Sequence, residues 1–538
     1  MSAIHPVELI VPSHRNPAEL INTLERILNV RSAAQYPIVR TYYDSFDWRL
    51  YRSGFYFAVD DAENRLSAVY GTLDSAGHYD PDALDKPPRF ARDLPNEKWR
   101  NRLEDALGVR ALLPQVQLHG TRNAYWLDDH SGHGMFKLTL DAYRVDTARG
   151  PLPLENRLRT ESANLPRKNY RHILDRVINE FGLEPAIEPL LTEALIAAGK
   201  TPADPSALPQ RPLDPNLRAD TAVKLVLRNL LDVMLINENG VKDDLDAEFL
   251  HDFRVAVRRT RAVLSQTKGA FLERPTAKYS REFAALGQVT GEPRDLDVQL
   301  LGFESYKAGL PGPMQADLAP LQAFLIEKAA KAHEQLNKHL QSAAHHRLIR
   351  DWRIFLEKPA PRKPRSPQAL LPIGELVDRR IWKLYRRIIA QGKAVKSDTP
   401  VEPIHDLRKT GKKLRYVMEL FQGLYSPEQM KQTLKMLKRL QDNLGQFQDA
   451  HVQIENSRRY AFDLRKAGAP TETLLAIGAL IERLYRRQKT VRNEFADCFG
   501  EFAQESHQRR FRQLFAPSRT REKEQRASDE PIRPASAA

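Results

Sequence analysis

The chain has 538 residues, 41% of them hydrophobic and 28% charged, a balance typical of globular proteins with roughly two to four domains. No apolar run approaches the roughly 18 residues of a membrane span, the N-terminal residues lack a secretory signal, and the single cysteine, Cys498, excludes an intramolecular disulfide and fits a reducing cytoplasm. The formal net charge is +14, and the whole excess follows residue 200: residues 1–200 hold 25 Lys and Arg against 27 Asp and Glu, and the remainder holds 58 against 42. Such a basic part suggests an anionic partner, although a merely soluble cationic surface would carry the same charge.

The first 200 residues are predicted to mix strands and helices. Runs of aromatic and β-branched residues at 41–43, 55–57 and 136–140 indicate strands. Apolar residues at helical spacing indicate helices at 16–28 and 168–181.

Two proline-rich stretches, at 201–216 and 358–372, punctuate the remainder. Proline at this density cannot continue a helix or a central strand, so the first stretch is predicted to be a linker. Apolar residues at three- and four-residue intervals predict helices throughout 217–357 and 367–516. The polar tail at 517–538 is predicted to be disordered.

The two helical segments share a motif. Residues 248–264 read EFLHDFRVAVRRTRAVL, and residues 402–418 read EPIHDLRKTGKKLRYVM at an offset of 154. A second match follows each copy, because a Leu-Gly pair precedes Arg294-Asp295 in the first segment and Gln448-Asp449 in the second. This self-similarity indicates duplication of one helical unit.

On a helix turning about 100° per residue, each copy of the motif places an apolar face opposite a basic stripe. The first stripe comprises His251, Arg254, Arg258 and Arg261. The second stripe comprises His405, Arg408, Lys412 and Arg415. We find no alternating acids four residues away that would neutralise these cations, so they should repel one another unless an external anion completes the site. The planar guanidinium of Arg can donate two parallel hydrogen bonds to phosphate oxygens, and the ammonium of Lys supplies a mobile positive charge. Anion binding is therefore favoured over a simply solvated face.

Two roles remain open for His251 and His405, which begin the stripes. Each ring either hydrogen-bonds locally near a helix start or donates an N–H to a phosphate oxygen, and nearby cations favour its neutral form until an anion arrives. Metal ligation is disfavoured because no second ligand follows at a metal-site spacing. Further basic residues at helical spacing would widen the surface: Arg379, Lys383, Arg386, Lys435 and Lys438.

At these residues the chain resembles the CHAD family, the conserved histidine α-helical domain. The resemblance is carried by HDFRVAVRRTRAVL, RDLDV, HDLRKTGKKLRYVMELF and LGQFQDAHV and covers about residues 214–516. It implies two helical bundles related by a pseudo-twofold axis, inorganic polyphosphate as the ligand, and association with polyphosphate granules. The ligand-facing residues that it implies are His251, Arg254, Arg258, Arg259, Arg261, Arg294, His405, Arg408, Lys412, Lys413 and Arg415. The sequence departs from the family where Gln448 replaces an expected Arg and where 290–293 look inserted.

Residues 1–200 resemble the CYTH family, the triphosphate tunnel fold. The resemblance is carried by TYYDSFDWRLYRSG at 41–54 and implies a mostly antiparallel, β-barrel-like domain. CYTH enzymes open with an E-x-E-x-K strand whose carboxylates hold a divalent metal, whereas the corresponding strand here holds one acid, Glu8, and 57–73 lacks a paired Arg and Lys clamp. Metal-assisted hydrolysis needs several carboxylates and such a clamp. We therefore expect a degenerate barrel without triphosphatase activity.

The sequence thus predicts an α+β protein with a CYTH-like domain at 1–200, a linker at 201–216 and an all-α CHAD domain at 217–516. The predicted function is polyphosphate binding in the cytoplasm, on polyphosphate granules, with granule proteins as further partners and with no catalytic residue, cofactor, metal or membrane. Long phosphate chains should bind best because they reach both repeats. Two alternatives stay open: sequence-independent nucleic-acid binding, disfavoured by the few aromatics available for base stacking, and a CYTH-like triphosphatase.

Overall fold

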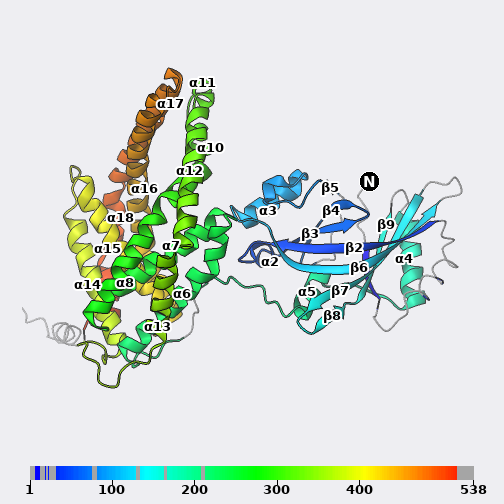
Figure 1. Cartoon of the computed structure of the whole chain (residues 1–538), viewed down its shortest axis with the longest axis horizontal. Coiled ribbons are helices and arrows are strands. Elements are labelled where there is room, and N and C mark those ends of the chain that lie inside the picture. Colours follow the sequence, from blue (N-terminus) through cyan, green and yellow to red (C-terminus); the bar gives the residue numbers. More distant parts are fainter. Residues whose placement is uncertain are drawn as a thin grey trace, which may run out of the picture. The chain divides into compact units, whose positions relative to one another are not determined.

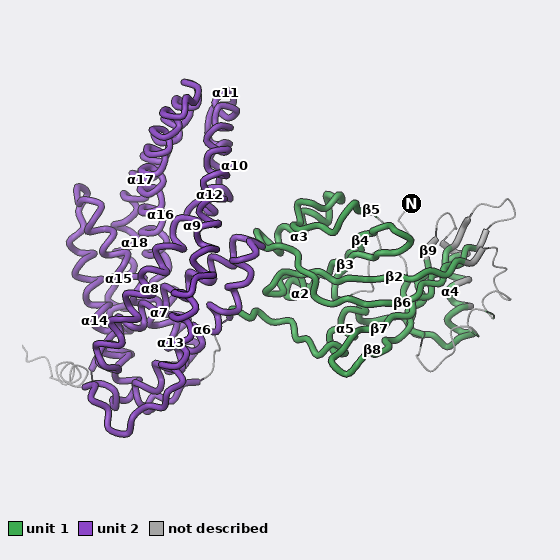
Figure 2. The backbone as a smooth tube through the Cα atoms, viewed as in Figure 1, with its two compact units in different colours: residues 1–206 green, residues 207–538 purple. Residues whose placement is uncertain are grey.

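The computed structural model describes residues 7–11, 19, 22, 32–74, 82–128, 134–162, 167–207 and 212–517. The chain forms two compact units, residues 1–206 and 207–538 (Figure 2). In the described ranges, no helix is long and apolar enough to cross a membrane. The helix predicted at 16–28 lies almost wholly outside these ranges, as does the tail after residue 517.

Within the described residues, unit 1 is built on one ten-stranded sheet, and its antiparallel pairing is what the resemblance implies (Figure 1). The strands pair in the order β10-β1-β9-β7-β6-β2-β3-β4-β5, and β8 pairs with β7. The strands are β1 (Val7–Val11), β2 (Ser32–Asp44), β3 (Phe55–Ala62), β4 (Arg65–Thr72), β5 (Ala83–Leu84), β6 (Leu113–Asp128), β7 (Gly134–Thr147), β8 (Gly150–Pro153), β9 (Asn156–Ser162) and β10 (Glu184–Pro185). The helices are α2 (Arg49–Arg52), η1 (Ala91–Asp93), α3 (Glu97–Leu107), α4 (Arg167–Phe181) and α5 (Leu190–Ala197).

Strand β3 is buried on both faces. Phe57 and its neighbour across the sheet, Tyr70, belong to a core closed by α3, where Tyr70 stacks on Trp99 with ring centroids 5.2 Å apart. Tyr56 and Ala58 belong to a second core that includes α5. Because side chains alternate along a strand, the two cores lie on opposite faces of β3.

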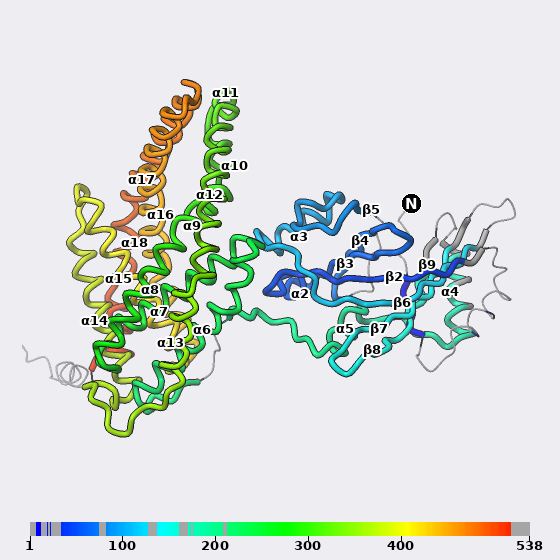
Figure 3. The backbone as a smooth tube through the Cα atoms, in the orientation of Figure 1, coloured from blue at the N-terminus to red at the C-terminus, as the bar shows by residue number. Residues whose placement is uncertain are grey.

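Unit 2 is helical, as predicted, and Figure 3 follows its chain through two successive repeats. The first repeat contains α6 (Ala219–Lys242), α7 (Ala247–Gln266), α8 (Glu273–Val289), α9 (Gly291–Leu301), α10 (Phe303–Lys307), α11 (Gly312–Ala316), α12 (Ala319–Leu340) and α13 (Ala343–Glu357). The second contains α14 (Ile373–Lys393), α15 (Val401–Leu420), η2 (Gln422–Leu424), α16 (Pro427–Lys466), α17 (Thr471–Asn493), α18 (Phe495–Phe502) and α19 (Glu505–Phe515).

The repeats keep one register through the motif helices. Helices α7 and α15 begin at residues 247 and 401, and α8 and α16 begin at 273 and 427, so both pairs are offset by 154. The insertion expected at 290–293 is therefore wrong, and Arg294 corresponds to Gln448. The two repeats differ instead by a break at Thr290, whereas α16 is continuous. Pro293 has no backbone N–H to donate to Val289, which accounts for the break.

The proline-rich segment at 358–372 is attached to the first repeat by backbone hydrogen bonds. Ala219 N donates to Leu371 O at 2.9 Å, and Gln368 N donates to Gly269 O at 2.9 Å. Proline-rich chain keeps its carbonyl acceptors even where it lacks donors, so it can pack without regular structure.

Candidate functional site

Helices α7 and α15 are amphipathic, as the motif predicts. Asp246 caps α7 by accepting hydrogen bonds from Glu248 N and Phe249 N, which fixes where the helix begins. Phe253 and Val257 on α7 are fully buried, as is Leu414 on α15. The apolar faces are thus committed to the core, and the basic faces lie away from it.

A cavity of about 700 Å³ lies between α7, α15 and α16. The predicted site residues that line it are His251, Arg258, Arg259, Arg408, Lys412 and Arg415. They come from both repeats, and α7 and α15 pack against each other. The fold therefore brings together cations that lie about 150 positions apart in the sequence.

Arg258, Arg408 and Lys412 form the cationic centre of this cavity. Burial, aided by the charges of Arg408 and Arg258, lowers the pKa of Lys412 to about 8. Burial also lowers the pKa of Arg408, and Arg258 adds to that effect. No carboxylate lies within ion-pairing distance of Arg258 or Lys412 in residues 212–517. The centre therefore holds like charges that disfavour one another's charged forms.

Carboxylates pair with Arg259, Arg415 and, within the centre, Arg408, which corrects the expectation that the stripes lack acids four residues away. Glu419 accepts from Arg415, four residues earlier on α15, and its Oε2 lies 2.8 Å from Arg259 Nη2 on α7. Asp449 on α16 lies 3.4 Å from Arg408 Nη2. Helix periodicity within one stripe did not reveal Asp449, because it comes from another helix.

Arg254 and Arg294 lie outside the cavity lining and bond to nearby backbone. Arg254 Nη1 lies 3.3 Å from Gly287 O and 3.2 Å from Thr290 Oγ1, at the C-terminal end of α8. Arg294 Nη1 donates to Ala247 O at 2.9 Å. Arg254 lies at a helix C-terminus, where carbonyls lack intrahelical partners, whereas Arg294 binds at the first residue of α7. Both side chains therefore support the first repeat.

Arg261 packs across α8, where glycine leaves it room. A Cβ at Gly287 would lie 3.0 Å from Arg261 Nη1, so any larger residue there would push the guanidinium aside. Arg261 does not line the cavity, although it belongs to the first stripe.

The two motif histidines have different surroundings. His405 Nδ1 lies 2.8 Å from Gln448 Oε1, so its hydrogen bond reaches another helix, α16, and is not the local bond near a helix start that was one of its two open roles. The partner is the residue at which the sequence departs from the family pattern. His251 instead lines the cavity.

The remaining predicted residues lie elsewhere. Arg379, Lys383 and Arg386 are exposed on α14 and do not line the cavity, and Arg379 pairs with Glu375. Lys413 is exposed on α15.

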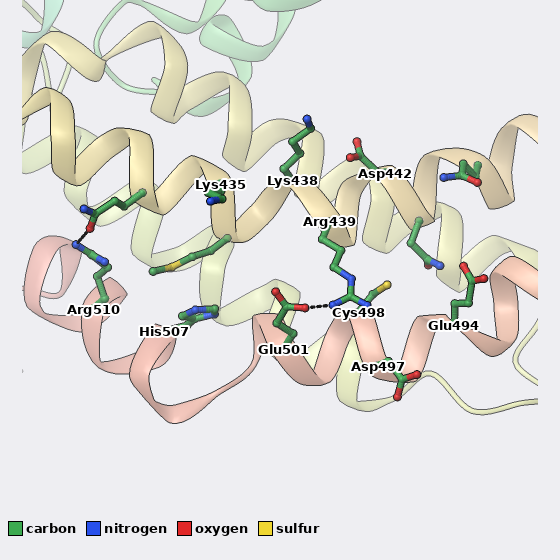
Figure 4. A pocket seen from close by; sticks show the side chains of 14 residues that line it. Lys435, Lys438, Arg439, Asp442, Glu494, Asp497, Cys498, Glu501, His507 and Arg510 are labelled. Atoms are coloured by element: carbon green, nitrogen blue, oxygen red, sulfur yellow. Dashed lines mark hydrogen bonds and ion pairs between the residues drawn. The ribbon is translucent and has the colours of Figure 1, made fainter.

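Lys435 and Lys438 line a second cavity, of about 800 Å³, between α16 and the α18–α19 region (Figure 4). Figure 4 shows Arg439 of α16 reaching Glu501 of α18 beside Cys498. The cations of this cavity are balanced by Asp442, Glu494 and Asp497 in addition to Glu501. The second cavity is therefore not an extension of a purely basic surface.

Unit 1 holds a buried network of arginines and aspartates that the sequence analysis missed. Arg40 binds Asp60, and Arg122 binds both Asp141 at 2.6 Å and Asp60 at 3.1 Å. All four side chains are at most 7% exposed. Burial opposes ionisation of Asp60, but Arg40 and Arg122 outweigh it and lower the pKa of Asp60 to about 2. The sequence did contain a signal for this network: Asp60 is a charged residue on the same strand face as Tyr56 and Ala58, whose side chains favour burial.

These aspartates do not fit the metal set that CYTH enzymes use. Asp60 and Asp141 are each bound by arginine, and within the described ranges no three His, Cys, Asp or Glu side chains are grouped so as to hold a metal ion.

Fold and site together define a two-unit α+β protein whose helical unit is internally duplicated around a cationic cavity. Residues 225–457 match the model of the CHAD domain, in the part of the chain where the motifs predict it.

Solved structures with similarity to the chain include the CHAD domain of the plant Ricinus communis, at 23% identity and a TM-score of 0.47, covering 55% of this chain and 96% of that one. PptA from Streptomyces chartreusis has 16% identity and a TM-score of 0.42, with coverage of 52% and 99%. A Hippeastrum protein with a dominant triphosphatase activity is similar to the N-terminal part, at 13% identity and a TM-score of 0.25, with coverage of 36% and 96%. No curated protein sequence matches the chain.

Proposed function

We propose that unit 2 binds inorganic polyphosphate in the cavity between α7, α15 and α16. One observation carries the proposal: Arg258 from the first repeat meets Arg408 and Lys412 from the second, and no carboxylate in residues 212–517 pairs with Arg258 or Lys412. Like charges held this close cost free energy, and a bound polyanion would recover part of that cost by adding counter-charge.

A linear phosphate chain suits the way these cations are spaced. Arg408, Lys412 and Arg415 span seven residues of α15, which is about 10 Å of helix. A ligand with a charge on each unit contacts several such cations at once and releases condensed counterions as it binds.

The cavity offers little to a nucleobase. Tyr416 is the one Phe, Tyr or Trp among its lining residues, whereas proteins that bind single strands without sequence preference stack successive bases on aromatic rings. Nucleic acid therefore remains the second candidate, bound through its phosphates alone.

A competition titration separates the two candidates. Labelled long-chain polyphosphate would be bound to the full chain at near-physiological salt and challenged with single-stranded DNA and with RNA at equal phosphate concentration. Polyphosphate should hold the site against both competitors. Equal competition by either nucleic acid would replace polyphosphate binding with a general affinity for phosphate backbones.

Polyphosphate granules in the cytoplasm are the location that this function would give the protein, and other granule proteins are the further partners that we propose. A fluorescently tagged full chain should colocalise with granules, and Arg258→Ala/Lys412→Ala should remain diffuse. Colocalisation of the variant would show that recruitment does not depend on the cavity.

For unit 1 we propose a role without triphosphate hydrolysis. The proposal is supported by Asp60 and Asp141, whose oxygens accept from arginines and are thereby withdrawn from metal binding.

A further inference from the structure

Glu419 joins the two repeats inside the candidate cavity. Its Oε2 lies 2.8 Å from Arg259 Nη2 of the first repeat, and its Oε1 accepts from Arg415 of the second. The side chain is only 17% exposed. Although burial acts in the opposite sense, the Glu419 carboxylate raises the pKa of Arg415 above its ordinary value. One carboxylate therefore holds two of the cavity's cations.

The duplication shows that this acid is peculiar to the second repeat. At the offset of 154, Glu419 corresponds to Ser265, whose hydroxyl donates to Ala262 O within its own helix at 2.9 Å. Arg259 corresponds to Lys413, and no carboxylate in residues 212–517 pairs with Lys413. The two motif helices therefore share their basic stripe, but the first has no carboxylate at the position equivalent to Glu419; the carboxylate that it contributes to the cavity lining is Asp252.

We propose that Glu419 is a built-in competitor for the polyanion site, whose carboxylate occupies Arg259 and Arg415 until phosphate oxygens displace it. The inference rests on the proposed function and adds a control on affinity to it. A carboxylate between two guanidiniums presents the oxygen acceptors that a phosphate would present. Both arginines remain partly exposed, at 24% for Arg259 and 47% for Arg415, so a ligand can reach them.

Displacement has a measurable cost. A ligand that takes over both arginines must first break their existing ion pairs, which costs free energy. Because Glu419 already neutralises part of their charge, the ligand also releases fewer of its own condensed counterions than it would on binding two unpaired arginines. Removing the carboxylate should therefore strengthen binding and also steepen its dependence on salt.

The test compares polyphosphate binding to the full chain and to Glu419→Ser, which installs the residue of the first repeat. Glu419→Gln keeps the shape of the side chain and gives a second readout if the serine variant folds poorly. Glu482→Ser is the matched control, because Glu482 also pairs with an arginine four residues away, Arg486, but lies outside the cavity.

We expect the Glu419 variants to bind about three- to tenfold more tightly at low salt, with a slope of log affinity against log salt steeper by about one to two. Glu482→Ser should bind like the wild type. If the wild type binds but the Glu419 variants bind equally or more weakly, Glu419 positions the arginines and the inference fails while the proposed function stands. If the wild type does not bind polyphosphate, the proposed function fails and the inference fails with it.

Discussion

The guanidinium of Arg40 binds the carboxylate of Asp60 through two hydrogen bonds, from Nε to Oδ1 at 2.6 Å and from Nη2 to Oδ2 at 2.8 Å. Arg122 binds the same carboxylate, and both arginines are almost fully buried. Asp60→Asn should therefore lower the free energy of unfolding by about 3–5 kcal/mol, because it leaves buried positive charge without its partner. Asp61→Asn, at the adjacent exposed position, is the control for urea unfolding of the full chain. Equal stabilities of the two variants would refute a structural role for the network.

The same carboxylate predicts the direction of acid sensitivity. The pKa of Asp60 is lowered to about 2 in the folded protein, below its value in the unfolded chain. The contribution of ionised Asp60 to the free energy of unfolding is therefore complete above about pH 4, and it is lost as the pH falls towards 2. Between pH 7 and pH 4, the free energy of unfolding of the wild type should show no decrease that is due to Asp60. A difference between wild type and Asp60→Asn that shrinks above pH 4 would contradict this assignment.

The pairing in unit 1 also predicts an absence of hydrolysis. With Mg²⁺ or Mn²⁺, the full chain should release phosphate from inorganic triphosphate no faster than buffer does, because Asp60 and Asp141 are held by arginines. The measurement is colorimetric phosphate release. Divalent-dependent release that Asp141→Asn abolishes would establish an active site in unit 1.

The sequence was sufficient to predict the helical unit, its duplication and the two basic stripes. These features depend on helical periodicity, which each segment of sequence displays by itself. The cavity residues Arg258 and Lys412 were among those predicted, although their meeting across the repeats required the fold.

Features that depend on other elements could not be read from one stripe. Asp449 reaches Arg408 from α16, and Gln448 reaches His405 from the same helix. The internal charges of unit 1 were hidden for a related reason. Arg40, Asp60 and Arg122 come from three strands, and their mutual pairing is what makes their burial tolerable.

Arg254 and Arg408 occupy equivalent positions in the repeats but should have different mutant effects. Arg254→Ala removes hydrogen bonds to Gly287 O and Thr290 Oγ1 and should cost about 1–3 kcal/mol of stability with little change in polyphosphate affinity. Arg408→Ala should weaken binding and leave stability nearly unchanged, since Arg408 lines the cavity. Thermal unfolding and titration of both variants give the comparison, and loss of binding in Arg254→Ala alone would reverse the assignment.

Lys412 predicts a pH dependence of binding. Burial and the neighbouring arginines lower its pKa to about 8, and a bound polyanion should raise that pKa again by favouring the charged form. Binding therefore takes up a proton near and above pH 8, so affinity should fall as the pH rises from 7 to 9. Lys412→Arg keeps its charge throughout this range and should show a flatter profile in titrations at constant ionic strength. Identical pH profiles for the wild type and Lys412→Arg would show that Lys412 does not contact the bound polyanion.

Polyphosphate titration of two double variants at near-physiological salt tests the central claim most directly. Arg258→Ala/Lys412→Ala removes two cations of the cavity centre, and Arg486→Ala/Lys489→Ala removes the same charge from α17, outside the cavity. We predict that the cavity variant loses at least about tenfold in affinity while the control changes by much less. The cavity variant loses two direct contacts with the ligand, whereas the control loses only long-range attraction, which salt screens. Equal losses in the two variants, or undiminished binding by the cavity variant, would show that the cavity is not the polyphosphate site.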